Sequence, residues 1–566
     1  MLLSGLAAAG PPVEAGLLFV LPPAGFATLG DAARRAVPSS VPVAASSGRF
    51  ACGSGPATLD WSTPAFDLVL AVDAVEIVPS DGVLSVAVEG SLGSAPGEVR
   101  VSGDCAVLEA LDEVCPLQLP TTPFSAAFSV ALEPSDAGGL PRFVAAPVAF
   151  TLAPIANPLS DCLLSSALGT ALGQDPALLS DLVAASATPA LDGLGPALED
   201  ALDGLLAGLV IREQVDVLGA PLRFDLAPTR VALGPAGLEI GLGGGLSGPE
   251  DPCAPAPAAL RGAGWPDPSA PFAGTSLRPD AALHLNLDLV DSSLHSVYAA
   301  GLLCQDLGAL VAREVGLSLD GPVVLNLLGP AAADLLGDDA PARLLLEPGA
   351  VPAAAAFEDA PQLVVDLGAP RLLVESALDE RALIVGNLTV DLRPGLTLAA
   401  EAGALTATLD LGPVRLIEQD HSLLTPGYGA GLAGLLDTLL PTLLPAGPLF
   451  AAPLPAPLGA PVAALGFRPA DDGATLAGYA LLDANAVTPI APAACTLGCE
   501  GGGPSVDPAA LLGCDGAATG CDGGCSGAAC AQSGAPLAAA RGRLLLGAVV
   551  VFGIAVRRRS RALPLR

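Results

Sequence analysis

The side chains that could carry out chemistry are few in this 566-residue sequence. There are three histidines, His284, His295 and His421, and Ser-His-Asp catalysis needs one of them beside a nucleophile. The sequence has no G-x-S-x-G turn, P-loop or dinucleotide fingerprint. His284 occupies a polar position of an alternating segment and His295 lies near a predicted helix start, so we expect both to be solvated. We therefore expect no catalysis and no cofactor, with a secreted hydrolase as an alternative.

The 12 cysteines fall into two groups. An even number of scattered cysteines in an exported protein indicates disulfides, and Cys105 and Cys115 are the first candidates because they bracket one short loop. The crowded group near the C-terminus lacks nearby histidines and the C-x-x-C spacing of zinc ribbons, which argues against a metal site. The scattered group is Cys52, Cys105, Cys115, Cys162, Cys253 and Cys304, and the crowded group is Cys495, Cys499, Cys514, Cys521, Cys525 and Cys530.

The composition of the chain argues against nucleic acid as a partner. The chain is 52% hydrophobic but only 3% aromatic, and its net charge is -34. Arginine supplies all of its basic side chains. A surface this acidic repels nucleic acid and anionic lipid headgroups, so we expect no nucleic-acid partner. The core must be built from Leu, Val and Ala, and the length allows two or three domains.

The C-terminal segment indicates where the protein is located. An apolar run, Leu544 to Val556, ends in Arg557, Arg558 and Arg559. A spanning helix needs about 20 residues, so this run is too short for an ordinary anchor. Arginines after an apolar segment stay on the cytoplasmic side, which predicts that everything before the run is exported. Residues 1–10 are apolar but lack a basic region, as in the remnant of a signal peptide.

The order Gly524-Cys525, apolar run and arginine cluster resembles the MYXO-CTERM sorting tail of surface proteins from myxobacteria-like organisms. The resemblance covers only the tail. It implies that a sorting protease cuts near Gly524 and Cys525 and that the cysteine is kept at the surface, with Cys514 as second choice. It also implies the cell surface or outer membrane of a Gram-negative bacterium. A plain, weak tail anchor is the alternative.

Strand and helix patterns alternate in the first half of the body. Residues 17–21 predict a short strand, and a helix over 24–36 follows the Pro22-Pro23 break. Residues 66–77 and 83–90 alternate at period two around a turn at 79–82, which is typical of half-buried antiparallel strands. A helical region is predicted over 157–209. Its last part carries an apolar stripe of Leu191, Leu194, Leu198, Leu202, Leu205 and Leu209.

The second half repeats this device. Leu283, Leu285, Leu287 and Leu289 alternate with polar residues and predict a strand. Residues 291–293 are then expected to cap a helix. Further strands are predicted at 362–367, 371–377, 382–393, 396–401 and 405–417, a helix at 431–440, and closing strands near 462 and 476–482.

These patterns predict an α+β protein of two consecutive units, each a highly curved antiparallel sheet wrapped around a long amphipathic helix. A disordered Gly/Cys linker and a short C-terminal apolar helix complete the fold class. The expected domains are a possible signal-peptide remnant at 1–10, a first barrel at 11–248, a linker at 249–278, a second barrel at 279–490, a Gly/Cys-rich spacer at 491–532, and a sorting or anchor segment at 533–566.

The segment 283–303, an alternating strand, a polar cap and an apolar helix with Tyr298 near Ala-Gly-Leu, resembles bactericidal/permeability-increasing-like proteins. So do the opening residues 16–36 and the closing segment 453–479. These proteins belong to the TULIP superfamily of tubular lipid-binding proteins, so the resemblance implies acyl chains bound between sheet and helix. The residues expected to bind lipid are Leu17, Phe19, Leu198, Leu202, Leu205, Leu294, Val297, Tyr298 and Leu302. The acidic surface favours neutral or zwitterionic lipid, and a surface scaffold or adhesin without a cavity is the alternative.

Overall fold

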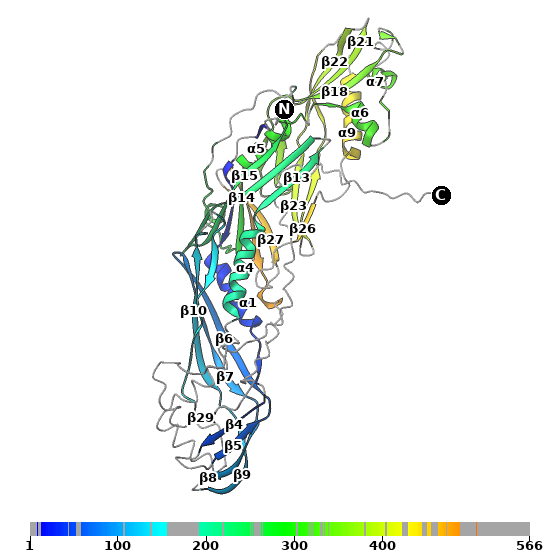
Figure 1. Ribbon diagram of the computed structural model, residues 1–566. Coiled ribbons are helices and arrows are strands. Elements are labelled where there is room, and N and C mark those ends of the chain that lie inside the picture. Colours follow the sequence, from blue (N-terminus) through cyan, green and yellow to red (C-terminus); the bar gives the residue numbers. More distant parts are fainter. Residues whose placement is uncertain are drawn as a thin grey trace, which may run out of the picture.

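The computed structural model of the chain is elongated, with five sheets arranged along its long axis (Figure 1). It describes residues 8–486 with gaps, the longest at 156–190, 254–261 and 454–461, together with residues 505 and 506. Strand pairing within the described residues is antiparallel except between β29 (Ser505–Val506) and β4 (Ser46–Ala51). The predicted C-terminal helix and the sorting segment lie outside the described residues. The predominance of curved antiparallel sheets agrees with the predicted fold class.

The central sheet joins the two halves of the chain. Its strand order is β13-β14-β15-β2-β16-β28-β27, and β1 pairs with β15. Strand β2, from the first half, lies between β15 and β16, where Leu18 pairs with Gly241 on one side and His284 on the other. The strands are β1 (Ala8–Ala9), β2 (Val13–Leu21), β13 (Ile211–Val217), β14 (Ala220–Gly234), β15 (Gly237–Gly248), β16 (Ala281–Asn286), β27 (Val462–Pro469) and β28 (Thr475–Leu482). The two predicted units therefore share one sheet.

A six-stranded sheet extends from the central sheet in the first half of the chain. Its order is β11-β10-β7-β6-β3, and β12 pairs with β10. Period-two burial along its long strands confirms the alternation predicted from the sequence, and Gly82, at φ +73°, forms the β6–β7 turn. The strands are β3 (Ser40–Val43), β6 (Phe66–Ser80), β7 (Val83–Ser94), β10 (Thr122–Glu133), β11 (Arg142–Ala145) and β12 (Ala149–Leu152).

Three five-stranded sheets complete the described architecture. The sheet at the lower end of Figure 1 contains β29, β4, β5 (Thr58–Thr63), β8 (Gly97–Cys105) and β9 (Leu108–Leu117). The sheet at the upper end contains β17 (Gln305–Asp306), β18 (Ala342–Glu347), β21 (Arg371–Leu378), β22 (Arg381–Asp391) and β25 (Arg415–Asp420). The third contains β19 (Ala353–Ala356), β20 (Leu363–Asp366), β23 (Gly395–Glu401), β24 (Ala404–Asp410) and β26 (Phe450–Pro453). The single strand predicted over 405–417 is thus two strands in different sheets.

Six α-helices lie within the described residues: α1 (Pro23–Ala36), α4 (Leu194–Gly208), α5 (Leu287–Ala299), α6 (Leu307–Glu314), α7 (Gly321–Leu328) and α9 (Tyr428–Leu443). Helix α5 begins earlier than the sequence pattern predicts. Asn286 is its N-cap, because the Asn286 side chain accepts a hydrogen bond from the Asp288 backbone N–H at 2.9 Å. The predicted cap at 291–293 is therefore wrong, and Asp291 instead accepts a hydrogen bond from the backbone N–H of Ala354.

Residues 264–278, predicted to be part of a free linker, pack against the central sheet. The Trp265 ring lies over Gly241, where a side chain would overlap it. Phe272 makes edge contacts with the rings of His284 and Tyr479, at centroid distances of 6.2 and 5.8 Å. We call residues 264–278 the strap. One buried apolar cluster runs through both halves beneath these elements, from Val13 to Leu476.

Candidate functional site

One face of the six-stranded sheet is a continuous apolar surface. Its buried side chains come from alternate positions of β6, β7 and β10, as expected for strands with one face toward a core. We define the apolar strip as the eight buried apolar side chains of the two middle strands, which are Leu84, Val86, Val88 and Leu92 of β7 and Phe124, Ala126, Phe128 and Val130 of β10. Strand β7 from Leu84 to Leu92 spans about 26 Å at 3.3 Å per residue, so the strip runs along an elongated path.

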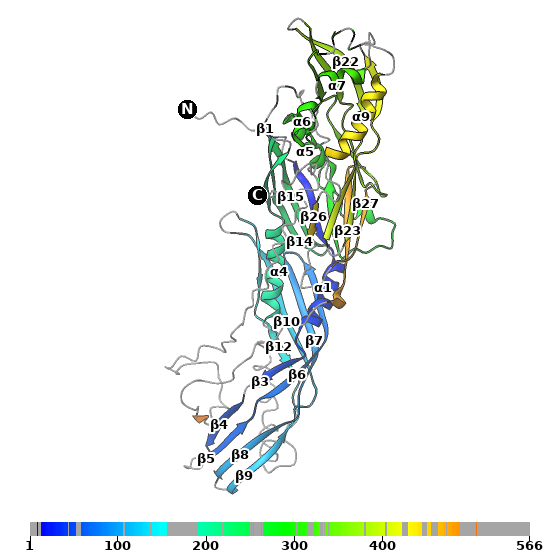
Figure 2. The ribbon, with the colours of Figure 1, turned by 90° about the vertical axis from the view of Figure 1, so that its right-hand side faces the viewer.

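Helices α1 and α4 pack on this face at its two margins. In α1, Gly30 approaches the backbone of Val75 on β6, whereas in α4, Gly195 lies against Phe128 and Ala145. Strand order places β6 and β11 on opposite sides of β7 and β10, so the strip lies between the helices. Figure 2 shows α4 and α1 on either side of β10 and β7.

Helix α4 is attached to the sheet margin by two carboxylates. Asp203 accepts a hydrogen bond from the Phe143 backbone N–H at 2.8 Å, and Glu199 accepts one from the Ala145 N–H at 3.2 Å. Both donors belong to β11, which is the last strand at this end of the sheet. The helix therefore accepts hydrogen bonds from backbone N–H groups that an edge strand would otherwise leave without a partner. Leu198, Leu202 and Leu206 form the buried apolar face of α4.

The structure brings most of the predicted lipid-binding residues into one apolar cluster. Leu17, Leu198, Leu202 and Leu294 are buried in it, and Phe19, Leu205 and Val297 pack partly buried against it. Tyr298 is fully buried, and its hydroxyl donates a hydrogen bond to the carbonyl oxygen of Gly349 at 2.7 Å. Burial raises the pKa of the Tyr298 phenol. Leu302 lies outside the described residues.

Helix α5 packs tightly on the central sheet through small polar residues. The Ser296 hydroxyl donates hydrogen bonds to the carbonyl oxygens of Leu246 and Ser292. A side chain placed at Gly248 would overlap Leu222 of β14 at 2.5 Å, whereas its contact with Ala300, just after α5, would be an ordinary one at 3.4 Å. This face of α5 therefore contacts the sheet directly through Ser296.

Both histidines of this region are buried, so the expectation that they are solvated is wrong. His284 has 0% of its surface exposed and His295 8%. Neither ring nitrogen of His284 has a hydrogen-bond partner among the described residues. Burial lowers the pKa of His284 to about 4, and the carboxylate of Asp267 opposes this effect. His284 lies on an inner strand of the central sheet, where Phe272 of the strap packs against its ring.

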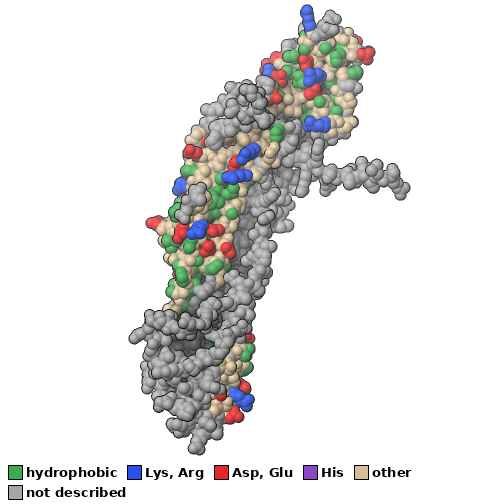
Figure 3. Space-filling view, in the orientation of Figure 1, with side chains coloured by type: hydrophobic (Ala, Val, Ile, Leu, Met, Phe, Trp, Pro, Cys, Tyr) green, Lys and Arg blue, Asp and Glu red, His purple; other side chains and the backbone are tan. Residues whose placement is uncertain are grey.

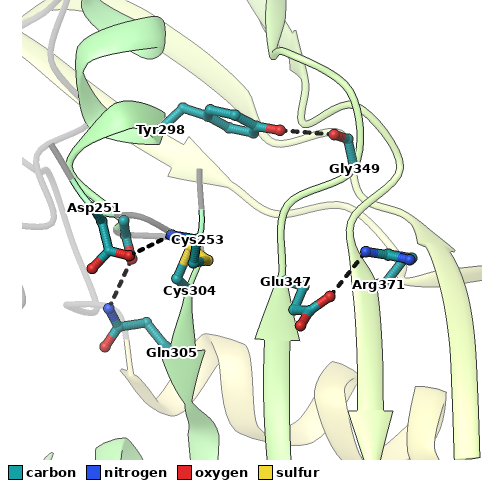
Figure 4. The surroundings of a disulfide bond; sticks show 9 residues. Asp251, Cys253, Tyr298, Cys304, Gln305, Glu347, Gly349 and Arg371 are labelled. Atoms are coloured by element: carbon teal, nitrogen blue, oxygen red, sulfur yellow. Dashed lines mark hydrogen bonds and ion pairs between the residues drawn. A yellow bond between two sulfur atoms is a disulfide. The ribbon is translucent and has the colours of Figure 1, made fainter. Parts of the chain in front are cut away.

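A disulfide joins the chain ahead of the strap to the end of α5. Cys253 and Cys304 are bonded with their Cα atoms 6.3 Å apart (Figure 4). Asp251 lies beside them and accepts a hydrogen bond from the Cys253 N–H at 2.8 Å. Ligand atoms of these three residues lie within 4.8 Å of one another, but the disulfide leaves no thiolate to bind a metal ion.

The strand register argues against the predicted bond between Cys105 and Cys115. Cys105 pairs with Leu108, whereas Cys115 pairs with Val99 on the same strand as Cys105. Six residues of strand separate Val99 from Cys105, about 20 Å, and a disulfide spans Cα atoms about 4.4–6.8 Å apart. Cys115 is buried and takes part in a disulfide.

The outer face of the six-stranded sheet carries a shallow hollow of about 380 Å³. Its walls include Glu76, Val78, Ser85, Ala127 and Pro147. It is open to solvent and lies on the face of these strands opposite the apolar strip, since the side chains of Val78, Ser85 and Ala127 occupy exposed positions. The hollow is also lined by Val86 and Phe128, which belong to the apolar strip.

Charges on the visible face of the molecule are mixed in sign. Figure 3 shows Arg side chains lying beside Asp and Glu, and the ion pairs Arg230–Glu239, Arg343–Asp306 and Arg371–Glu347 bear this out at 2.9–3.0 Å. The described residues on this face form no basic patch. Across the described part of the chain, no helix combines the length and hydropathy that crossing a membrane requires.

No family model and no curated protein matches this chain. Solved structures do. A lipopolysaccharide binding protein is 17% identical, with a TM-score of 0.47 over 83% of this chain and 99% of its own. P47 of Clostridium botulinum E1 is 7% identical, with a TM-score of 0.23 over 83% of this chain and 100% of its own. Takeout 1 of Epiphyas postvittana is 18% identical, with a TM-score of 0.14 over 22% of this chain and 62% of its own.

Sequence reasoning missed the apolar strip and the carboxylates of α4. The alternation of β7 and β10 could have identified the strip, because it marks Val86, Val88, Phe124 and Phe128 as facing one side. Asp203 and Glu199 carry a weaker signal, since acidic residues opposite a leucine stripe are also typical of a solvated helix face.

Proposed function

We propose that this protein binds lipid without catalysis, holding an acyl chain along the apolar strip between α1 and α4. The strip supports this proposal because it is long and apolar and has a helix at each margin. Thr122, the one buried polar side chain on β7 or β10, donates its hydroxyl hydrogen to the Pro120 carbonyl oxygen and so offers no hydrogen to a ligand. Only an apolar ligand lowers the free energy of the system when it replaces water on such a surface.

A neutral or zwitterionic lipid fits this proposal better than an anionic one. Capture of phosphate-rich headgroups needs clustered Arg or Lys. Here the net charge is -34, and many Arg side chains already form ion pairs with acids. Whether the protein carries lipid between membranes or only binds it is a further question within the same proposal.

A second part of the proposal concerns location and rests on the sequence of the tail. We propose that the protein is exported, that a protease processes it near Gly524 and Cys525, and that it stays at the outer membrane of a Gram-negative bacterium. The segment from Leu544 to Arg559 serves this sorting step rather than as a permanent anchor. Mass spectrometry of the mature C-terminus tests the tail, and an intact peptide ending at Arg566 would contradict it.

The lipid proposal is tested on the full chain purified from cells by solvent extraction and mass spectrometry. We expect about one neutral or zwitterionic lipid molecule for each apolar strip, that is, for each protein chain. Recovery of no stoichiometric lipid, with no binding of a fluorescent fatty acid or phospholipid, favours a surface scaffold or adhesin.

Val88→Phe separates a lipid-lined strip from an ordinary core. If lipid occupies the strip, the larger ring displaces it, so lipid content falls while the unfolding temperature is retained. If the strip is a closed core, overpacking lowers stability by about 1–3 kcal/mol. Ala87→Phe, on the exposed side of the same strand, is the matched control.

A further inference from the structure

The strap, residues 264–278, is tied to the body near its two ends and packs on the sheet between them. Ahead of it, the Cys253–Cys304 disulfide joins the chain to the end of α5. Behind it, Asp280 accepts hydrogen bonds from the Thr28 hydroxyl at 2.7 Å and the Leu482 N–H at 2.8 Å. These ties would hold the strap near the sheet even if its middle lifted.

The middle of the strap is held mainly by ring packing. Hydrogen bonds of Thr275, Arg278 and Ser269 stay within the strap. Among the described residues, one hydrogen bond crosses from sheet to strap, from the Asn286 side-chain amide to the Gly264 carbonyl oxygen at 3.2 Å. Trp265 over Gly241 and Phe272 against His284 and Tyr479 add ring packing, and Pro271 is buried between them in sequence.

Beneath the strap, His284 is buried, and neither of its ring nitrogens has a hydrogen-bond partner among the described residues. A buried polar group that lacks a hydrogen bond costs about 1–3 kcal/mol, and a charged one costs more. The imidazole is therefore tolerated under the strap only while it is neutral.

We propose that the strap is an acid-sensitive cover: protonation of His284 drives the middle of residues 264–278 off the central sheet. The sign follows from the burial of the imidazole. In the closed form its pKa is about 4, and exposed to water it returns to about 6.5. Closure is fully favoured above pH 6.5 and weakens as the pH falls toward 4. The open-to-closed ratio rises by up to about 300-fold across this window.

Charged groups around His284 include some that stabilise its protonated form and some that destabilise it. On the strap, Asp267 attracts the imidazolium. Its own pKa is lowered by hydrogen bonds from Ser269, so it stays ionised through the window. On β27, Arg468 pairs with Ala477, the β28 neighbour of His284, and it approaches Glu358 at 4.0 Å.

The remaining charged neighbours are mostly acidic. On β15, Glu239 is paired with Arg230 at 3.0 Å. On β2, Leu18 lies directly beside His284, and Glu14 is the charged residue of that strand. Asp280 on the sheet side is engaged by Thr28 and Leu482.

Trp265 reports the position of the strap. The chain has two tryptophans, so Trp61→Phe leaves Trp265 as the single fluorophore. In the lipid-free full chain we expect acrylamide quenching of Trp265 to rise as the pH falls from 7 to 4, with far-UV circular dichroism unchanged. In His284→Leu, which cannot ionise, quenching should stay low throughout. Equal pH dependence in both proteins, or no rise in the parent, overturns the proposal.

Two further variants keep the test decisive if His284→Leu fails to fold. Phe272→Ala removes the ring contact and should raise quenching already at pH 7. Asp267→Asn removes the attraction to the imidazolium, so opening at a given pH below 6.5 should increase. If Phe272→Ala leaves the quenching at pH 7 unchanged, the strap does not cover the sheet as proposed. Because the readout needs no lipid, this result is independent of the lipid-binding proposal.

Discussion

The two strand-to-helix segments, β2 with α1 and β16 with α5, lie side by side in the central sheet but bury different chemistry. Helix α1 buries Phe26, Leu29 and small residues, without a polar side chain. Helix α5 buries Asp288, Ser292, Ser293, His295 and Ser296 along with its apolar residues. The strands pair directly, Leu17 with Leu285 and Leu18 with His284, so the contrast arises between neighbouring and similarly built segments.

This contrast is one of degree, because α1 makes directed bonds from Thr28 to Asp280 and from Arg35 to Asn485, whereas α5 makes several such bonds from its buried face. Ser296, Tyr298 and Asp291 attach α5 to β15, to Gly349 and to β19. Hydrogen bonds require fixed angles, whereas apolar contacts are non-directional. The first half can therefore adapt to a guest of variable shape more easily than the second. Within the proposed function, the strip beside α1 and α4 is the preferred lipid site.

The largest expected effect is a charge in the adaptable half. Leu202→Asp puts an unpaired carboxylate into the buried face of α4, and we expect destabilisation on the order of 3 kcal/mol or more, together with loss of bound lipid. Urea unfolding and solvent extraction measure the two effects. Ala207→Asp, exposed on the same helix, is the control, and equal losses in both variants would remove the distinction between the two faces.

Removing the disulfide should weaken the fixed half specifically. Cys253→Ser combined with Cys304→Ser opens a loop with a sequence separation of 51, which corresponds to about 4 kcal/mol in the chain-entropy account. Urea unfolding followed at Trp265 should shift to lower urea. The same titration followed at Trp61, in the lower sheet, should shift little; a common shift would show that the halves unfold together.

A smaller effect is expected from the directed bonds of α5. Tyr298→Phe removes the hydroxyl that donates to Gly349 and leaves that carbonyl oxygen without this donor, so we expect a loss of about 1 kcal/mol in urea unfolding. Tyr479→Phe removes a half-buried hydroxyl and serves as the control. If the two variants are equally stable, directed bonding does not distinguish α5.

The smallest expected change is at the edge of the six-stranded sheet. Glu199→Gln keeps an acceptor for the Ala145 N–H but removes its charge, and it should cost about 0.5 kcal/mol. Hydrogen exchange at Ala145 should accelerate, and exchange at Ala126, on the neighbouring strand β10, should not. Unchanged exchange at Ala145 would mean that α4 does not depend on this carboxylate.

Sequence reasoning predicted local structure well where the burial pattern was regular. The helix over 24–36 and the strands 66–77 and 83–90 lie within α1, β6 and β7. It failed at Asn286, because the leucine alternation continues past the true strand end and only a side-chain hydrogen bond reveals the helix start. It failed at His284, because alternation cannot show that a second layer covers the polar face.

Long-range pairing was also beyond local patterns. Nothing within residues 13–21 indicates that β15 and β16 will flank that strand, so the sequence predicts two consecutive units without showing that one sheet joins them. The strap was interpreted as a linker from its Pro and Gly content, although Trp265 and Phe272 are the residues that fasten it. Sequence reasoning predicted the leucines of α4 as site residues but did not predict the apolar strip.

The position of β2 also constrains the order of folding. Residues 13–21 leave the ribosome before their partners, which are β15 at 237–248 and β16 at 281–286. Until β15 is synthesised, this apolar strand has neither of these neighbours. Contacts this distant in sequence form slowly, and an unpaired apolar strand is prone to aggregate. The chain therefore depends on whatever shields Leu17 to Leu21 during synthesis.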